Sequence, residues 1–158
     1  MDIVEVDIRP FTVADAPAFR TLNEDWINEY FGLEEEDRLV LNDPVAHVLR
    51  PGGHIFMAFV DEVAVGCCCL IPMEPGVFEL AKMTVATPFR GKSIGRKILA
   101  YTIDRAKSLG ATRLFLGSNN KLADAIHLYE AYGFRHLKPE DAPSSPYVRA
   151  NVFMEMNL

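Results

Sequence analysis

Apolar residues recur along the chain at two different periods, and these periods divide it into predicted strands and helices. Runs that alternate with a period of two, or that are continuously apolar, predict strands. These runs are Ile3–Arg9, His54–Val60, Val63–Ile71, Val77–Val85, Arg113–Gly117, a short run from Phe134, and Tyr147–Met156. Runs with a period of three to four residues predict amphipathic helices. The first of these helices begins at Thr12 or Asp15 and ends at Tyr30. The others cover Glu35–Leu41, Pro44–Leu49, Ser93–Leu109 and Leu122–Tyr132.

The order of these elements predicts the fold class. Short connections between the three strands from His54 to Val85 predict an antiparallel meander. The strand, helix and strand from Val77 to Gly117 require a parallel crossover if both strands share a sheet. We therefore expect an α+β domain with a mixed, mostly antiparallel sheet flanked by helices. A surface loop rich in proline and serine, from Pro139 to Pro146, precedes the last strand, and no repeat or domain boundary interrupts residues 1–158.

Composition narrows the class of protein. The 158 residues are 49% hydrophobic and 24% charged, as in an ordinary soluble domain. No apolar run approaches the ~20 residues that span a bilayer, and acidic residues at the N-terminus do not fit a secretory signal. We expect a cytoplasmic protein without a membrane partner. The net charge of −6 argues against nucleic-acid binding and is compatible with a cationic amine substrate.

Two clusters of reactive residue types have simple structural interpretations. The acidic run Glu34–Asp37 is interpreted as a solvated helix start rather than a binding site. The consecutive cysteines Cys67–Cys69 lack the spacing of metal ligands, so they are interpreted as small buried residues on both faces of a strand. No metal is expected.

The segment from Arg90 to Gly95 is the most informative chemical feature. It reads Arg-Gly-Lys-Ser-Ile-Gly and lies between a predicted strand and a predicted helix. Its glycines allow a tight turn, and the unpaired amides of the following helix attract phosphate. Its spacing fits neither the P-loop nor the dinucleotide-binding fingerprint. The alternative interpretation is a basic helix start after an ordinary turn.

With a second segment downstream, this loop resembles a known family. Ala125 to Phe134 reads Ala-Ile-His-Leu-Tyr-Glu-Ala-Tyr-Gly-Phe, and it looks like the second signature of the GNAT superfamily of N-acetyltransferases. The first signature of that family, Arg/Gln-x-x-Gly-x-Gly/Ala, resembles residues 90–95. The resemblance covers Glu79 to Leu137, while the N-terminal third matches in element order only. One position departs from the family pattern, because Ser93 replaces its middle glycine.

The resemblance implies that acetyl-CoA is the cosubstrate, and it assigns residues to it. The amides of Ser93, Ile94 and Gly95 would hold the pyrophosphate. The remaining cofactor residues implied by the family pattern are Arg90, Gly91, Lys92 and Arg96 near the phosphates, Met83 and Val85 along the pantetheine arm, and Asn119 after the next strand. Asn120 is a rival for Asn119, and a loop-capping asparagine is the alternative for both. At Ser93, a positive φ would cost about 1 kcal/mol. With another φ, the hydroxyl would contact phosphate or cap the helix.

The resemblance also implies the catalytic groups. Tyr129 matches the tyrosine that protonates the departing thiolate, and Glu79 stands where some members place a general base, acting directly or through water. The alternatives are a packed tyrosine and an exposed or substrate-orienting carboxylate. Trp26, Tyr30 and Phe31 are candidates for the acceptor pocket, with core packing as the alternative, and His127 is expected at the surface or in packing.

We therefore expect an enzyme that acetylates a primary amine of a small molecule or peptide by direct attack in a ternary complex. A cysteine-bound acyl intermediate is not expected, because the three cysteines lie in an apolar strand. The alternative function is a non-catalytic acyl-CoA-binding or regulatory domain on the same fold. The late strands, from Phe134 and Tyr147, offer an edge for a homodimer.

Overall fold

A seven-stranded sheet forms the centre of the computed structural model, which describes residues 5–158. Its spatial order is β1 (Asp7–Pro10), β2 (His54–Val60), β3 (Val63–Glu74), β4 (Val77–Val85), β5 (Arg113–Ser118), β7 (Val152–Asn157) and β6 (Arg135–Leu137). Every neighbouring pair is antiparallel except β4 and β5. The predicted fold class, the meander and the parallel crossover are all confirmed.

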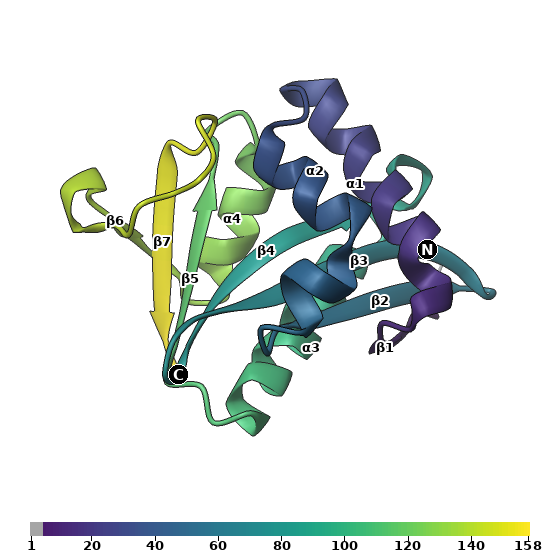
Figure 1. The fold of residues 1–158 in the computed structure, drawn as a ribbon, viewed down its shortest axis with the longest axis horizontal. Coiled ribbons are helices and arrows are strands. Elements are labelled where there is room, and N and C mark those ends of the chain that lie inside the picture. The colour runs from purple at the N-terminus through teal and green to yellow at the C-terminus, as the bar shows by residue number, and fades with distance from the viewer. Residues whose placement is uncertain (1–4) are drawn as a thin grey trace.

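Helices cover both faces of this sheet (Figure 1). α1 (Ala16–Tyr30) and α2 (Glu35–Asn42) lie on one face, and α3 (Ile94–Ser108) and α4 (Ala123–Ala131) on the other. A π-helical turn, Val45–Leu49, follows α2 where a short helix was predicted. Each face has its own apolar core. Cys67 and Cys69 belong to the core under α1 and α2, and Cys68 belongs to the core under α3, as strand alternation predicts.

The boundaries of the last strand and of the first strand differ from the prediction. The last strand begins at Val152 and not at Tyr147, because Val148 and Arg149 make hydrogen bonds with Glu34 and Asp37 at the start of α2. The sheet therefore ends at β6, and a homodimer across that edge stays a prediction. The first strand begins at Asp7, while Ile3 and Val4 lie outside the described residues. No helix within residues 5–158 is long and apolar enough to cross a membrane.

The feature that positions the candidate site is a split in the sheet. β4 pairs with β5 only from Val77 to Glu79, opposite Arg113 to Phe115. The rest of β4, up to Val85, pairs with β3 alone. The backbone of β4 from residue 80 onward therefore faces an opening instead of a neighbouring strand.

Candidate active site

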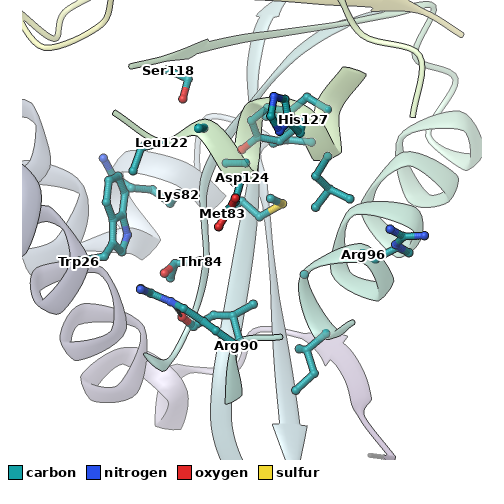
Figure 2. A pocket seen from close by; sticks show the side chains of 18 of the residues that line it. Trp26, Lys82, Met83, Thr84, Arg90, Arg96, Ser118, Leu122, Asp124 and His127 are labelled. Atoms are coloured by element: carbon teal, nitrogen blue, oxygen red, sulfur yellow. Dashed lines mark hydrogen bonds between the residues drawn. The ribbon is translucent and has the colours of Figure 1, made fainter. Parts of the chain in front are cut away.

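A cavity of about 720 Å³ opens where β4 and β5 separate. Its walls come from the second half of β4, the loop after β4, the first turn of α3, α4 and the C-terminal half of α1. Figure 2 shows Trp26 of α1 on one side of this cavity, Arg96 of α3 on the other and Met83 of β4 between them. Elements from distant parts of the sequence therefore meet at the split in the sheet.

The loop between β4 and α3 brings backbone donors to one end of the cavity. Arg90 is anchored there, because its Nε donates to the carbonyl oxygen of Val85 at 3.0 Å. α3 begins at Ile94, and the amide of Lys97 donates to the carbonyl of Ser93 at 3.2 Å. The amides that precede Lys97 in the first turn have no acceptor within the helix. Together with the helix dipole, these amides form a site that suits phosphate oxygens.

Ser93 has the left-handed backbone conformation that is usual for glycine. Its φ and ψ are 64° and 14°, and its side chain makes no capping hydrogen bond. Gly91, two residues earlier, also has a positive φ of 78°. Of the two alternatives for the departure from the family pattern, the structure therefore shows the positive φ. This conformation costs a residue with a Cβ roughly 1–2 kcal/mol.

A bulge interrupts β4 beside the cavity. Cys67 pairs with Thr84 and Cys69 with Ala81, so two residues of β4, Lys82 and Met83, lie opposite the single residue between those cysteines. Lys82 has a φ of 55°, and its carbonyl accepts a hydrogen bond from Sγ of Cys67 at 3.2 Å. A bulge with a left-handed first residue normally has glycine there. The backbone of Lys82, a residue with a Cβ, is therefore in a strained conformation.

Buried charges surround the Lys82 side chain on the α2 side. Its Nζ donates to Oδ1 of Asp37 at 2.6 Å and to Oη of Tyr147 at 3.0 Å. Arg149 makes a bidentate pair with the same carboxylate, at 2.6 and 2.8 Å. The side chains of Asp37 and Lys82 are 0% and 3% exposed. Asp37, Lys82, Tyr147 and Arg149 are called the charge cluster below.

The ionisation of Asp37 follows from this arrangement. Burial alone would raise the pKa of Asp37, but hydrogen bonds from Arg149 and the charge of Lys82 outweigh burial and lower the pKa to about 2. Burial lowers the pKa of Lys82, and the Asp37 carboxylate opposes that effect. The interpretation of Glu34–Asp37 as a solvated helix start is therefore only half right. The segment does begin α2, but Asp37 is fully buried within it.

Tyr129 lies in the wall of the cavity, on α4. Its side chain is buried, and its ring packs edge-on against Phe134. Burial raises the pKa of Tyr129 above its ordinary value, so the phenol stays protonated at neutral pH. No hydrogen bond to its hydroxyl is made within residues 5–158. The role of this phenol as the acid that protonates the thiolate stays a prediction.

Glu79 occupies the last position at which β4 still pairs with β5. Its side chain is partly buried, and it does not line the cavity. Burial raises the pKa of Glu79, and the charge of Lys82 opposes this. The carboxylate that does line the cavity is Asp124, in the first turn of α4 (Figure 2). A base role for Glu79 stays a prediction.

Asn119 serves the loop after β5. Its Nδ2 donates to the carbonyl of Arg149 at 2.7 Å, and its Oδ1 accepts from the amide of Lys121 at 2.8 Å. The amide of Asn120 donates to Oδ1 of Asn151 at 3.0 Å. Both polar ends of Asn119 are thus occupied by loop contacts, as the loop-capping alternative requires. A cofactor contact by either asparagine stays a prediction.

The cavity brings most of the predicted site residues together. Those that line it are Met83, Val85, Arg90, Gly91, Ser93, Ile94, Gly95, Arg96 and Tyr129, together with Trp26 and Tyr30 from α1. Lys92, Phe31, Glu79 and Asn119 do not line it. His127 is exposed, as expected of a surface residue, and it also lines the cavity. The sequence analysis missed Lys82, whose signal was a charged residue inside the apolar run Leu80–Thr84.

Comparisons with protein families, with relatives in sequence and with solved structures all lead to acetyltransferases. The profile of the Acetyltransferase (GNAT) family matches residues 10–134. The uncharacterized N-acetyltransferase YjgM of Escherichia coli is 29% identical over 138 residues, which are 82% of each protein. A GNAT-family acetyltransferase from Staphylococcus aureus superposes with a TM-score of 0.88 at 24% identity, over 97% of this chain and 99% of that one. YncA from Salmonella typhimurium, solved with acetyl-CoA, superposes with a TM-score of 0.75 at 19% identity, over 96% and 93%.

The split sheet and the family match define the class of this protein as an N-acetyltransferase. The chain belongs to the Acetyltransferase (GNAT) family.

Proposed function

We propose that this protein transfers the acetyl group of acetyl-CoA to a primary amine of a small molecule or peptide, by direct attack within a ternary complex. The observation that carries the proposal is the cavity at the split between β4 and β5. It has unpaired helix amides at one end, and Tyr129 and an aromatic wall from α1 elsewhere along it. YncA, a relative in fold, was solved with acetyl-CoA, which supports the choice of donor.

The residues around the cavity suit the chemical parts of acetyl-CoA. The free amides at the start of α3 and the cationic side chains of Arg90 and Arg96, which line the cavity, suit its phosphates, and Lys92 lies in the same loop outside the cavity wall. The unpaired edge of β4, at Met83 and Val85, suits an extended arm with amide groups, which pairs with it as an added strand would. Acetyl-CoA supplies an activated acetyl thioester when it is bound.

The chain supplies proton transfers and charge stabilisation. An alkyl amine with a pKa near ~10 is mostly protonated at neutral pH, so a base must remove a proton before attack. We assign this role to Glu79 acting through water, since its raised pKa makes it a stronger base than an ordinary carboxylate. Tyr129 protonates the departing thiolate. Amides of β4 near the bulge stabilise the negative charge that builds on the acetyl oxygen.

An acceptor screen tests the enzyme proposal. The unaltered protein is incubated with acetyl-CoA and a panel of amino acids, polyamines, aminoglycosides and peptides, and thiol release is followed. We expect release that depends on one class of amine. If acetyl-CoA binds, as a thermal shift would show, but no amine in the panel causes thiol release, the non-catalytic acyl-CoA-binding function is the better account.

A further inference from the structure

The strained bulge of β4 lies where the proposed reaction takes place. Lys82 and Met83 face the single residue Cys68, and both line the cavity beyond the point at which β4 leaves β5. The left-handed φ of Lys82 turns its carbonyl out of the strand ladder, toward Sγ of Cys67. The same turn of the backbone sets the direction of the amides that follow. The orientation of those amides therefore depends on Lys82 keeping an unfavourable conformation.

The charge cluster contacts the side chain of Lys82 from two other elements. Asp37 reaches it from α2, and Tyr147 reaches it from the loop before β7. Arg149 in turn fixes Asp37 through two hydrogen bonds. Because Asp37 and Lys82 are almost fully buried, their attraction is screened little by water. The cluster ties α2, β4 and the C-terminal loop together at one point of the cavity wall.

We propose that Lys82 is a positioning residue, whose ion pair with Asp37 holds the left-handed bulge and thereby aims the β4 amides at the acetyl group. The inference rests on the proposed acetyl transfer, and it gives the charge cluster a role in turnover rather than in stability alone. Asp37, Tyr147 and Arg149 act through Lys82 and need no contact with either substrate. The loop before β7 is thereby connected to the rate of the chemical step through Tyr147 and Arg149.

Two substitutions of Lys82 separate positioning from direct chemistry. Lys82→Gly removes the ammonium group but accepts a positive φ without strain, so the bulge persists and kcat stays within about threefold. Lys82→Met keeps a Cβ that strains the bulge and has no ion pair to hold it, so kcat falls roughly 10- to 100-fold through misplaced amides. The KM for acetyl-CoA changes less than kcat in both, because the phosphate-binding loop is separate from the bulge, although the proposed contacts of the pantetheine arm with Met83 and Val85 adjoin it. Equal loss of kcat in the two variants, or no loss in either, overturns the proposal.

A milder substitution and a matched control guard against unfolding. Tyr147→Phe removes one hydrogen bond to Lys82 and is expected to lower kcat about two- to fivefold. Glu155→Gln weakens two other partly buried ion pairs, with Arg113 of β5 and Arg135 of β6, and leaves kcat unchanged. If Glu155→Gln lowers kcat as much as Tyr147→Phe does, the effect of the cluster is only structural and the proposal fails.

A spectroscopic measurement keeps this test independent of turnover. In ¹H–¹⁵N spectra of the full chain, Lys82→Met shifts the amide signals of Met83 and Thr84, while Lys82→Gly moves them less. Unchanged signals in Lys82→Met contradict the proposal, whatever the activity. Absence of turnover in the unaltered protein contradicts the acetyltransferase function instead, so the two failures are distinguishable.

Discussion

Replacing Ser93 by glycine tests the backbone geometry of the phosphate-binding loop. Ser93 is solvent-exposed, has a φ of 64° and makes no capping hydrogen bond through its side chain. The substitution therefore removes a Cβ from a left-handed position without breaking a contact in the structure. Its effect on stability is set almost entirely by the backbone.

Two opposing contributions determine the size of the effect. Relief of the left-handed conformation is worth roughly 1–2 kcal/mol. The greater freedom of glycine in the unfolded chain offsets about 0.4–1 kcal/mol of this. The net gain in the free energy of unfolding is therefore about 0.5–1 kcal/mol, which raises Tm by about 1–4 °C for a chain of this length.

Thermal and urea unfolding of Ser93→Gly and the unaltered protein measure this gain, and calorimetry with CoA measures the affinity. The affinity is expected to change by less than about threefold, because the phosphate ligands proposed at this position are amides. Ser108→Gly is the matched control, since Ser108 lies in helical conformation at the end of α3 and the substitution should lower Tm. A lower Tm for Ser93→Gly would refute the reasoning about the loop.

Three further predictions concern ionisable groups. Tyr129→Phe should lower kcat about tenfold, a limited loss because a thiolate is already a good leaving group, and it should leave CoA affinity nearly unchanged. A variant with the same kcat as the unaltered protein would show that Tyr129 is not the acid. Glu79→Gln should lower kcat/KM about 100-fold. The rate of the unaltered protein should fall as pH drops through the raised pKa of Glu79, and this fall should be absent in Glu79→Gln. If Asp124→Asn gives these results instead, Asp124 is the base. Asp37, with its pKa lowered from 3.8 to about 2, should contribute roughly 2 kcal/mol of stability above pH ~4 that is lost as pH falls toward 2. Urea unfolding of the unaltered protein and Asp37→Asn should therefore converge at low pH, and a constant difference would contradict this.

The sequence predicts the regular parts of the fold because those parts bury continuous apolar faces. The meander from His54 to Val85 and the crossover to β5 have clear periodicity, and both are confirmed. The strand predicted from Tyr147 fails for a local reason. Val148, Ala150 and Val152 alternate with polar residues, but Val148 is 94% exposed because its backbone amide donates to Glu34 of another element. The alternation of apolar and polar residues alone therefore does not distinguish a strand from a loop that is held by hydrogen bonds to the side chains of a distant helix.

In the candidate site, too, some features follow from the local sequence and others depend on contacts between distant residues. The loop from Arg90 to Gly95 and the position of Tyr129 follow from local sequence, and the structure places them around one cavity. The Asp37–Lys82 pair joins residues 45 positions apart in the sequence. A charge inside an apolar strand signals a buried partner, but it does not identify that partner. The partner depends on how α2 packs over the sheet, which only the structure gives.

The most direct test of the central claim is the rate of thiol release from acetyl-CoA by the unaltered protein, measured against the amine panel with CoA binding followed in parallel. We predict saturable, amine-dependent release, together with a mass increase of one acetyl group on the acceptor. Tight CoA binding with no release and no acetylated product would contradict the account. The cavity at the split in the sheet would then be a site that binds CoA without catalysis.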